Sequence, residues 1–226
     1  MSAPNTDREV YLDNSATTRV CRAAADKVYA VMTENYGNPS SLHTRGFMAE
    51  QELADARASV AQLIGARPED VIFTSGGTEA NNLAVLGSVA AHARDGRHIV
   101  TTAVEHSSVA ACCDRLEKQG YEVTRLQPDG DGGITAEMSA AACRADTVLV
   151  AVMLVNNETG ARFRLEDAVA AIRSRAPHAH IHADAVQAAG KLPLKAERWG
   201  FDSLSLSAHK IHGPKGSGAL YLRRGS

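Results

Sequence analysis

The sequence predicts an α/β fold in which a mostly parallel sheet is covered by helices on both faces. Two observations carry this prediction. Short apolar segments alternate with segments of helical periodicity along most of the chain. Polar residues gather directly after the apolar segments, at the strand ends where open α/β sheets bind their ligands. The glycine-rich segment 213–218 is expected to join the last two strands.

The predicted elements follow in chain order. Residues 1–20 are expected to form an extended arm, and residues 21–226 the large domain. The helical segments have apolar side chains at helical spacing, as Leu83, Leu86 and Val89 illustrate, and they are 23–31, 49–63, 78–93, 107–119, 135–143 and 165–175. The strand segments are short apolar runs, and they are 71–74, 98–103, 121–126, 147–155, 180–183, 203–206 and 219–222.

Length and charge exclude several classes of protein. The 226 residues are enough to bury the core of one large domain. The formal net charge is −2 with both signs interspersed, so no basic stripe favours nucleic acid. The apolar runs are too short to span a membrane, and Met1 to Glu9 carry no signal-peptide core. We therefore expect a cytoplasmic protein without a nucleic-acid or membrane partner.

Lysine and aspartate at two strand ends point to a particular cofactor. Lys210 follows the apolar segment Phe201 to Leu206, between Ser207 and His209 on one side and a glycine-rich loop on the other. An amine in this setting suits Schiff-base chemistry. Asp184 ends another predicted strand, where a carboxylate can keep a pyridine nitrogen protonated or simply cap a following helix. An amine and a carboxylate of this kind are the minimum set of side chains that a pyridoxal phosphate site requires.

Three further strand ends supply polar groups for such a site. Gly76-Gly77-Thr78 opens a helix and suits a phosphate, although Thr78 as an ordinary N-cap explains the same residues. His106 follows the next strand and is either a loop histidine or a ring that stacks on the cofactor and moves a proton. Gln187 lies one helical turn beyond Asp184 and points the same way, toward a phenolic oxygen. Neither a Walker phosphate motif nor a dinucleotide fingerprint is present.

The cysteines and the alternating histidines have simpler explanations. Cys21, Cys112, Cys113 and Cys143 form no C-x-x-C pair, and we expect buried or partly buried thiols in a reducing compartment. The histidines at 178, 180 and 182 would share one strand face, but solvent-facing and core positions explain them better than a metal does. We therefore predict no metal site. Glu158, which follows two asparagines, can be explained as a turn residue.

The motifs, taken together, resemble those of a known family. The chain resembles the cysteine desulfurases, in the class V aminotransferase branch of the fold-type I pyridoxal phosphate enzymes. The matching stretches run in family order through almost the whole chain, and they are 11–18 (YLDNSATT), 38–43 (NPSSLH), 73–82 (FTSGGTEANN), 105–106 (EH), 155–160 (VNNETG), 182–187 (HADAVQ) and 207–216 (SAHKIHGPKG).

The resemblance implies a role for each matching residue. Lys210 would bind the cofactor covalently, Asp184 would pair with the pyridine nitrogen, and Gln187 with the phenolic oxygen. His106 would stack on the ring, and Asn157 would lie beside cofactor and substrate. The phosphate would be held by Gly77, Thr78, Ser207 and His209.

The resemblance also implies an activity and its partners. A desulfurase takes sulfur from L-cysteine, releases alanine and leaves a persulfide for iron–sulfur cluster or other sulfur-compound synthesis. It works as a homodimer with a sulfur-acceptor or scaffold protein. The alternatives are a selenocysteine lyase or other class V enzyme and, in another class, a non-catalytic remnant or partner-binding subunit.

The sequence departs from the family at one end. Family members continue well beyond the cofactor lysine, into a small domain that carries the persulfide cysteine and the arginine for the substrate carboxylate. The chain ends at Ser226, and none of its cysteines stands in a matching motif. We therefore expect an incomplete large domain without the C-terminal small domain, with the missing part possible on a separate chain.

Overall fold

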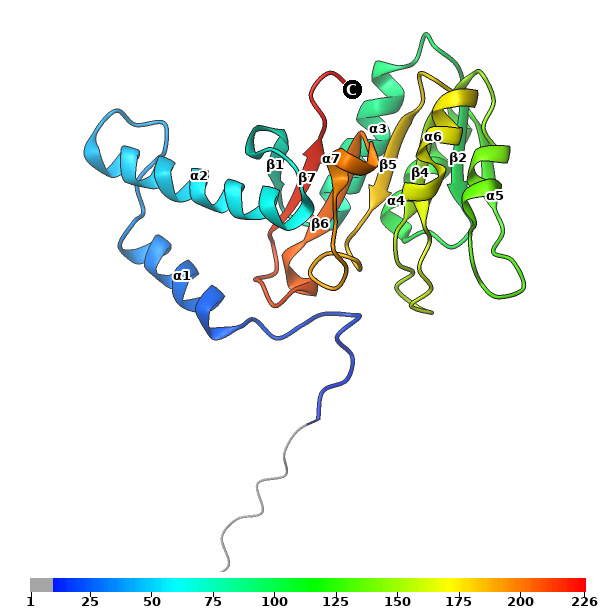
Figure 1. Cartoon of the computed structure of the whole chain (residues 1–226). Coiled ribbons are helices and arrows are strands. Elements are labelled where there is room, and N and C mark those ends of the chain that lie inside the picture. The colour runs from blue at the N-terminus through cyan, green and yellow to red at the C-terminus, as the bar shows by residue number, and fades with distance from the viewer. Residues whose placement is uncertain (1–9) are drawn as a thin grey trace, which may run out of the picture.

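A seven-stranded sheet forms the centre of the molecule in the computed structural model, which describes residues 10–226 (Figure 1). Residues 1–9 of the predicted arm lie outside the described residues, and the division into arm and large domain remains a prediction. The strands are β1 (Val71–Thr74), β2 (His98–Thr102), β3 (Glu122–Leu126), β4 (Thr147–Met153), β5 (His180–Asp184), β6 (Ser203–Ser207) and β7 (Gly218–Leu222). Their order across the sheet is β1-β7-β6-β5-β4-β2-β3.

The sheet is mostly parallel, as the sequence predicts. Strands β3, β2, β4, β5 and β6 pair in parallel, and each connection between them contains a helix or a long turn. Strand β7 pairs antiparallel with both β6 and β1. The reversal between β6 and β7 follows from the short glycine-rich segment that joins them, which is too short for a parallel crossover.

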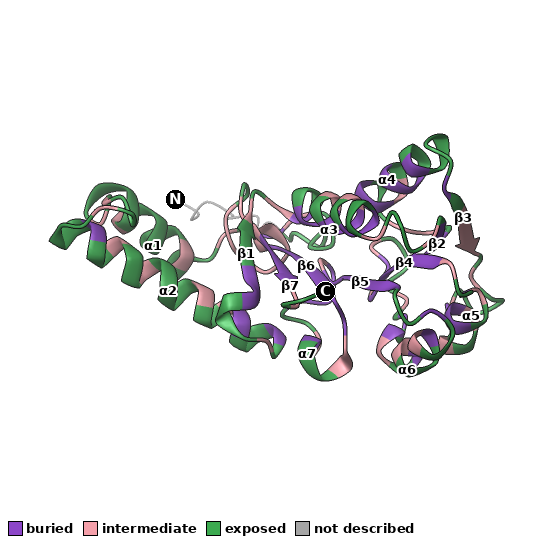
Figure 2. Cartoon of the chain, turned by 90° about the horizontal axis from the view of Figure 1, so that it is seen from above, coloured by how far each residue is buried: buried purple, intermediate pink, exposed green. Residues whose placement is uncertain are grey.

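Helices cover both faces of the sheet, as predicted. Figure 2 shows α3 and α4 along one face and α5, α6 and α7 along the other. The helices are α1 (Arg22–Thr33), α2 (Thr44–Ile64), α3 (Gly77–Ala91), α4 (Ser107–Lys118), α5 (Ala136–Ala141), α6 (Leu165–Arg175) and α7 (Ala196–Trp199). The sequence pattern does not predict α7, because four residues are too few to display a helical period.

The central strands are buried on both faces. Every residue of β2, β4, β5 and β6 is buried. Successive residues of β4 enter different halves of the core, since Leu149 packs in the cluster under α3 and α4 and Val150 in the larger cluster on the other face. His178 does not share a strand face with His180 and His182, because β5 begins at His180 and His178 is exposed in the preceding turn.

Helices α1 and α2 project from the sheet and remain largely uncovered (Figure 2). No residue of α1 is buried, and α2 buries only Gly46, Ala61 and Ile64. Large apolar side chains are exposed along this pair, including Tyr29 at 68%, Met32 at 72% and Phe47 at 56%. The pair thus carries an apolar surface with no partner in residues 10–226. No helix in the described part of the chain is both long and apolar enough to cross a membrane.

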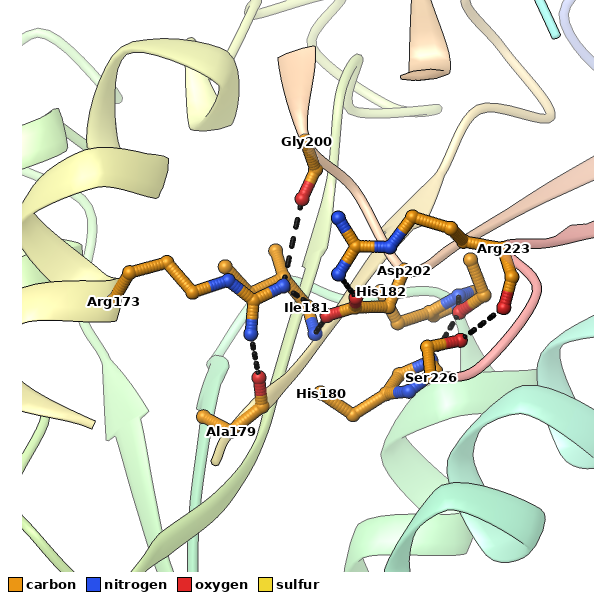
Figure 3. Close-up of polar contacts among 10 residues, drawn as sticks. Arg173, Ala179, His180, Ile181, His182, Gly200, Asp202, Arg223 and Ser226 are labelled. Carbon is orange, nitrogen blue, oxygen red and sulfur yellow. Dashed lines mark hydrogen bonds and ion pairs between the residues drawn. The ribbon is translucent and has the colours of Figure 1, made fainter. Parts of the chain in front are cut away.

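The amino-terminal ends of β5 and β6 meet at a buried carboxylate. Asp202 pairs with Arg173 from α6 and with Arg223 after β7, and it accepts the Ile181 backbone N–H at 2.8 Å (Figure 3). The Asp202 side chain is only 3% exposed. A buried carboxylate with two guanidinium partners and an amide donor is fully paired, so this cluster fastens three elements at one end of the sheet.

Candidate active site

A cavity of about 400 Å³ opens at the carboxyl ends of β4, β5 and β6 and at the start of α3. All the predicted site residues line it, and they are Gly77, Thr78, His106, Asn157, Asp184, Gln187, Ser207, His209 and Lys210. These residues come from five separate segments of the chain. The cavity is of the size typical for small-molecule and cofactor sites.

Lys210 reaches the cavity from the short 3-10 helix Ala208–Lys210, which follows β6 directly. It therefore lies one tight turn beyond the strand tip. Its Nζ donates hydrogen bonds to the carbonyl oxygens of Ser15 and Ala16, the latter at 2.9 Å. Burial and the neighbouring Lys191 lower the pKa of the Lys210 amine, against the opposing pull of nearby carboxylates. A lysine with a lowered pKa is more readily available as the neutral nucleophile.

Asp184 is the last residue of β5, and it is 5% exposed. Its Oδ1 accepts the Val186 N–H at 2.9 Å, and its Oδ2 accepts Asn81 Nδ2 at 2.7 Å. Within residues 10–226 it forms no ion pair, and no helix follows it, so it is not a helix cap. The cavity thus contains a buried carboxylate that no cation contacts directly among residues 10–226.

The start of α3 presents backbone donors to the cavity. Its N-cap is Gly76, which makes no side-chain capping bond, and Thr78 lies within the first turn rather than at the cap. A side chain at Gly77 would come within 2.6 Å of Val186 Cγ2 and 3.5 Å of Ser207 Cβ. Only glycine fits there, and it leaves the first N–H groups of a 15-residue helix open to an anion.

His106 and Asn157 also line the cavity. His106 is the N-cap of α4, where its Nδ1 accepts the Ser108 N–H at 3.2 Å and contacts Ser108 Oγ at 2.8 Å. Asn157 donates from Nδ2 to Glu158 Oε1 at 2.7 Å, and both residues line the cavity. The turn that carries them is held by Asn156, whose Oδ1 accepts the Glu158 N–H at 2.9 Å.

The predicted arm supplies cavity residues that the sequence analysis did not assign. Asp13, Ser15 and Ala16 line the cavity. Thr18 fixes this segment to the lysine loop, since its N–H and its hydroxyl both donate to the His209 carbonyl oxygen, at 2.8 and 2.9 Å. The Ser15 carbonyl oxygen also accepts Gln187 Nε2 at 2.8 Å. The only sequence signal was the YLDNSATT match, which marks the segment but predicts no contact.

The cysteines do not enter the cavity. Cys112, Cys113 and Cys143 are buried, whereas Cys21 is exposed, which corrects the expectation for that residue. Burial raises the pKa of Cys113 to about 12 and that of Cys143 to about 11, so these thiols are poor nucleophiles. Among the described residues, no group of three or more His, Cys, Asp or Glu side chains is arranged to hold a metal ion.

The residues of the cavity fit pyridoxal phosphate by their chemistry. An amine of lowered pKa, a carboxylate that no cation contacts and an open helix N-terminus correspond to the aldehyde, the pyridine nitrogen and the phosphate of that molecule. Ser207 and His209 stand beside the helix start and the lysine, where further phosphate donors are needed. No other ligand suggested by the sequence requires all three groups.

The fold and cavity together define an α/β protein with a lysine-based cofactor site at the ends of its parallel strands. The chain belongs to the aminotransferase class-V family, whose model matches residues 10–226. The family is pyridoxal phosphate-dependent, and the fold is that of the fold-type I enzymes, as the sequence predicts.

Curated relatives and solved structures agree with this assignment. Cysteine desulfurase 2 of Trichormus variabilis is 47% identical over 216 residues, which are 96% of this chain and 54% of that protein. Cysteine desulfurase IscS of Tolumonas auensis is 47% identical over 220 residues, again 54% of its length. A solved NifS-like protein superposes with a TM-score of 0.92 at 36% identity, covering 97% of this chain and 60% of the other. A structure described as SspA in complex with cysteine gives 0.89 at 34% identity, with 95% and 61% covered. The chain therefore spans about half the length of the curated relatives that it matches.

Proposed function

We propose that this chain binds pyridoxal phosphate and provides the cofactor half of a cysteine desulfurase. The observation that carries the proposal is the pair formed by Asp184 and Lys210, a buried carboxylate that no cation contacts and an amine of lowered pKa in one cavity. The desulfurase names of the relatives and the cysteine complex of one solved neighbour favour L-cysteine as substrate over selenocysteine.

Each residue acts on the cofactor or on a proton. The start of α3, with Thr78, Ser207 and His209, binds the phosphate. Asp184 would hold a proton on the pyridine nitrogen. Pyridoxal phosphate, when bound, would withdraw electrons from the α-carbon of an amino acid. Lys210 would act as the base for the α-carbon proton, and His106 would exchange a proton through the ring nitrogen that is not bonded to Ser108.

The thiol that accepts the sulfur is proposed to lie outside these 226 residues. Cys112, Cys113 and Cys143 are buried away from the cavity, and Cys21 does not line it. Sulfur transfer needs a positioned thiolate, because orientation alone contributes about 7–11 kcal/mol to lowering such a barrier. A second chain or segment would supply this thiol together with the group that binds the substrate carboxylate.

The exposed apolar surface of α1 and α2 supports an assembly. We propose a homodimer, to which a sulfur acceptor or scaffold protein binds, in the cytoplasm. Tyr29, Met32 and Phe47 are large apolar side chains that are all more than half exposed on this helix pair, and exposed apolar patches commonly mark interaction sites. This surface is equally suited to a second copy and to the remaining half of a desulfurase.

The test is an assay of sulfide and alanine from L-cysteine with a thiol reductant. The 226-residue chain is assayed alone and after addition of the C-terminal half of a related desulfurase. The proposal expects little product from the chain alone and a clear gain in equimolar products after the addition. Lys210→Ala is the matched control and should abolish the gain. Rapid equimolar production by the chain alone would place the acceptor thiol within it, and no gain in either case would contradict the desulfurase assignment.

A further inference from the structure

Asn81 is a fully buried asparagine at the second turn of α3, and every polar atom of its side chain is used. Its Nδ2 contacts Asp184 Oδ2 at 2.7 Å and Ser108 Oγ at 2.8 Å. Its Oδ1 contacts His182 Nε2 at 2.9 Å. The amide therefore joins β5 and α4 through three side chains, two of which line the cofactor cavity.

The chemistry of the partners fixes the direction of these bonds. An ionised carboxylate can only accept, so the atom beside Asp184 is the amide nitrogen, and its two hydrogens go to Asp184 and Ser108. The Asn81 oxygen must then accept a hydrogen bond from the N–H at His182 Nε2. The His182 Nδ1 is left to accept from Ser203 Oγ at 2.8 Å, and that hydroxyl in turn accepts from His180 Nε2 at 2.8 Å.

Burial agrees with this arrangement. Desolvation, with a smaller contribution from His180, lowers the pKa of His182 to about 3, and desolvation lowers that of His180 to about 4. Both imidazoles are therefore neutral at physiological pH and carry one proton each. His182 and His180, both labelled in Figure 3, continue the chain of hydrogen bonds from Asn81 at the cavity toward the amino-terminal end of β5.

The same logic fixes the proton of His106. Ser108 Oγ accepts from Asn81, so its own hydrogen is free to donate to His106 Nδ1 at 2.8 Å. The Ser108 backbone N–H donates to the same nitrogen at 3.2 Å. With two donors at Nδ1, the proton of a neutral His106 must sit on Nε2.

We propose that Asn81 is a positioning residue that aims the Asp184 carboxylate at the cofactor and, through Ser108, sets the His106 tautomer. The role of Asn81 toward Asp184 rests on the proposed cofactor binding. Its role toward His106 rests only on contacts within this chain. One amide thereby links the group that holds the ring nitrogen to the group that exchanges protons in the same cavity.

A purely structural role is the competing explanation, and the neighbouring residue shows why it is weaker. Asn82 also lies on α3, but it bonds to the Thr78 carbonyl of its own helix at 2.8 Å and receives Cys112 Sγ–H at 3.3 Å. It reaches Ser108 only at the backbone carbonyl, at 3.4 Å, and not at the hydroxyl that contacts His106. It touches neither Asp184 nor His106. Asn82→Ala is therefore a matched control, because it removes an amide from the same turn of the same helix.

The test compares wild type, Asn81→Ala, Asn82→Ala and Ser108→Ala by two measurements. The first is the ¹⁵N chemical shift of the His106 ring nitrogens in the ligand-free chain. The second is the dissociation constant for added pyridoxal phosphate, followed by absorbance. We expect the Nε2–H form of His106 in wild type and Asn82→Ala. In Asn81→Ala and Ser108→Ala the backbone N–H of residue 108 remains as a donor to Nδ1 at 3.2 Å, so we expect a measurable rise in the Nδ1–H form rather than its complete takeover. We expect Asn81→Ala to weaken cofactor binding about 10- to 100-fold, the range of a hydrogen bond to a charged group, and Asn82→Ala to leave it within about 2-fold.

Each contrary result has a separate meaning. A wild-type His106 protonated on Nδ1, or equal loss of cofactor affinity in Asn81→Ala and Asn82→Ala, would overturn the inference. If Asn81→Ala does not fold, the wild-type and Ser108→Ala tautomers still decide it. Absence of cofactor binding by the folded wild type would contradict the proposed function, while the tautomer measurement would still decide the role of Asn81 and Ser108.

Discussion

A buried carboxylate lies at each end of the strand pair β5 and β6. The two carboxylates differ in whether a cation contacts them. At the amino-terminal end, Asp202 contacts two arginines and a backbone N–H. At the carboxyl end, Asp184 accepts only from a backbone N–H and the neutral amide of Asn81. Both are almost completely buried, at 2% and 5% exposed.

The difference separates a structural charge from a functional one. A buried carboxylate is costly unless a cation balances it, and Asp202 has its cations within the chain. Asp184 has no cation in direct contact among the described residues, although its charge acts on the Lys210 amine in the same cavity. A bound group such as a protonated pyridine nitrogen is expected to supply the missing direct partner. The comparison therefore predicts that losing Asp202 affects folding, whereas losing Asp184 affects cofactor binding.

The largest expected effect is on stability at the Asp202 end. Asp202→Ala leaves Arg173 and Arg223 without their common partner. Because both guanidinium groups are partly exposed, at 27% and 38%, the expected cost is that of the lost charge-assisted hydrogen bonds, about 2–3 kcal/mol. Urea denaturation followed by circular dichroism measures the free energy of unfolding. A loss below about 1 kcal/mol would mean that this cluster does not fasten the sheet.

The converse effect is expected for Asp184→Asn. Loss of the charge should weaken pyridoxal phosphate binding about 10- to 100-fold, since a charge-assisted hydrogen bond to the ring becomes a neutral one. Stability should change less than in Asp202→Ala, because removal of a buried charge that no cation contacts offsets one lost hydrogen bond. Absorbance titration with the cofactor and urea denaturation check the two halves. Unchanged cofactor affinity would remove the functional distinction between the two carboxylates.

Acid should weaken the Asp202 end through His180. Desolvation lowers the pKa of folded His180 to about 4 from an ordinary value of 6.5, so the unfolded chain binds the proton first. Stability should therefore fall as pH decreases from 6.5 toward 4, by about 2 kcal/mol at pH 5 for this ring. Unfolding free energies at pH 7 and pH 5 should differ less in His180→Gln than in wild type. The exposed His178→Gln is the control and should behave as wild type.

Alkali should instead weaken the cavity end through Glu105. Its Oε1 accepts from Thr102 Oγ1 and the Met153 N–H, but its buried Oε2 has no partner within the described residues. Desolvation raises the pKa of Glu105 from 4.5 to about 8, so the folded state retains the proton longer than the unfolded state, and stability falls as pH rises between these values. Glu105→Gln should be more stable than wild type at pH 8, on the order of 1 kcal/mol after allowance for partial solvent access. An identical pH dependence of stability in the two proteins would contradict the raised pKa.

Local patterns predicted the fold and most of the cavity. The predicted helix 165–175 and strand 71–74 coincide with α6 and β1, because apolar periodicity and flanking breakers mark both. The residues after the parallel strands converge because the carboxyl ends of such strands share one edge of the sheet. That rule brought Asp184 and Lys210 together without knowledge of the strand order.

Contacts between distant segments could not be predicted in this way. The bonds from Lys210 to Ser15 and Ala16 join backbone carbonyls to a side chain far along the sequence, and no residue type signals them. Asp202 and its arginines come from three separate segments with no shared period. In the sequence Asn81 stood out only as part of the matching stretch 73–82, and its partners became apparent only when β5 and α4 were in place.

Reduction of the cofactor-loaded chain with borohydride tests the central claim most directly. The treatment fixes pyridoxal phosphate to the amine that holds it, and peptide mass spectrometry then locates the modified lysine. We predict modification at Lys210, the lysine that lines the cavity together with Asp184, and its loss in Lys210→Ala. Labelling centred on Lys191, Lys195 or Lys215, with Lys210 unmodified, would contradict the account.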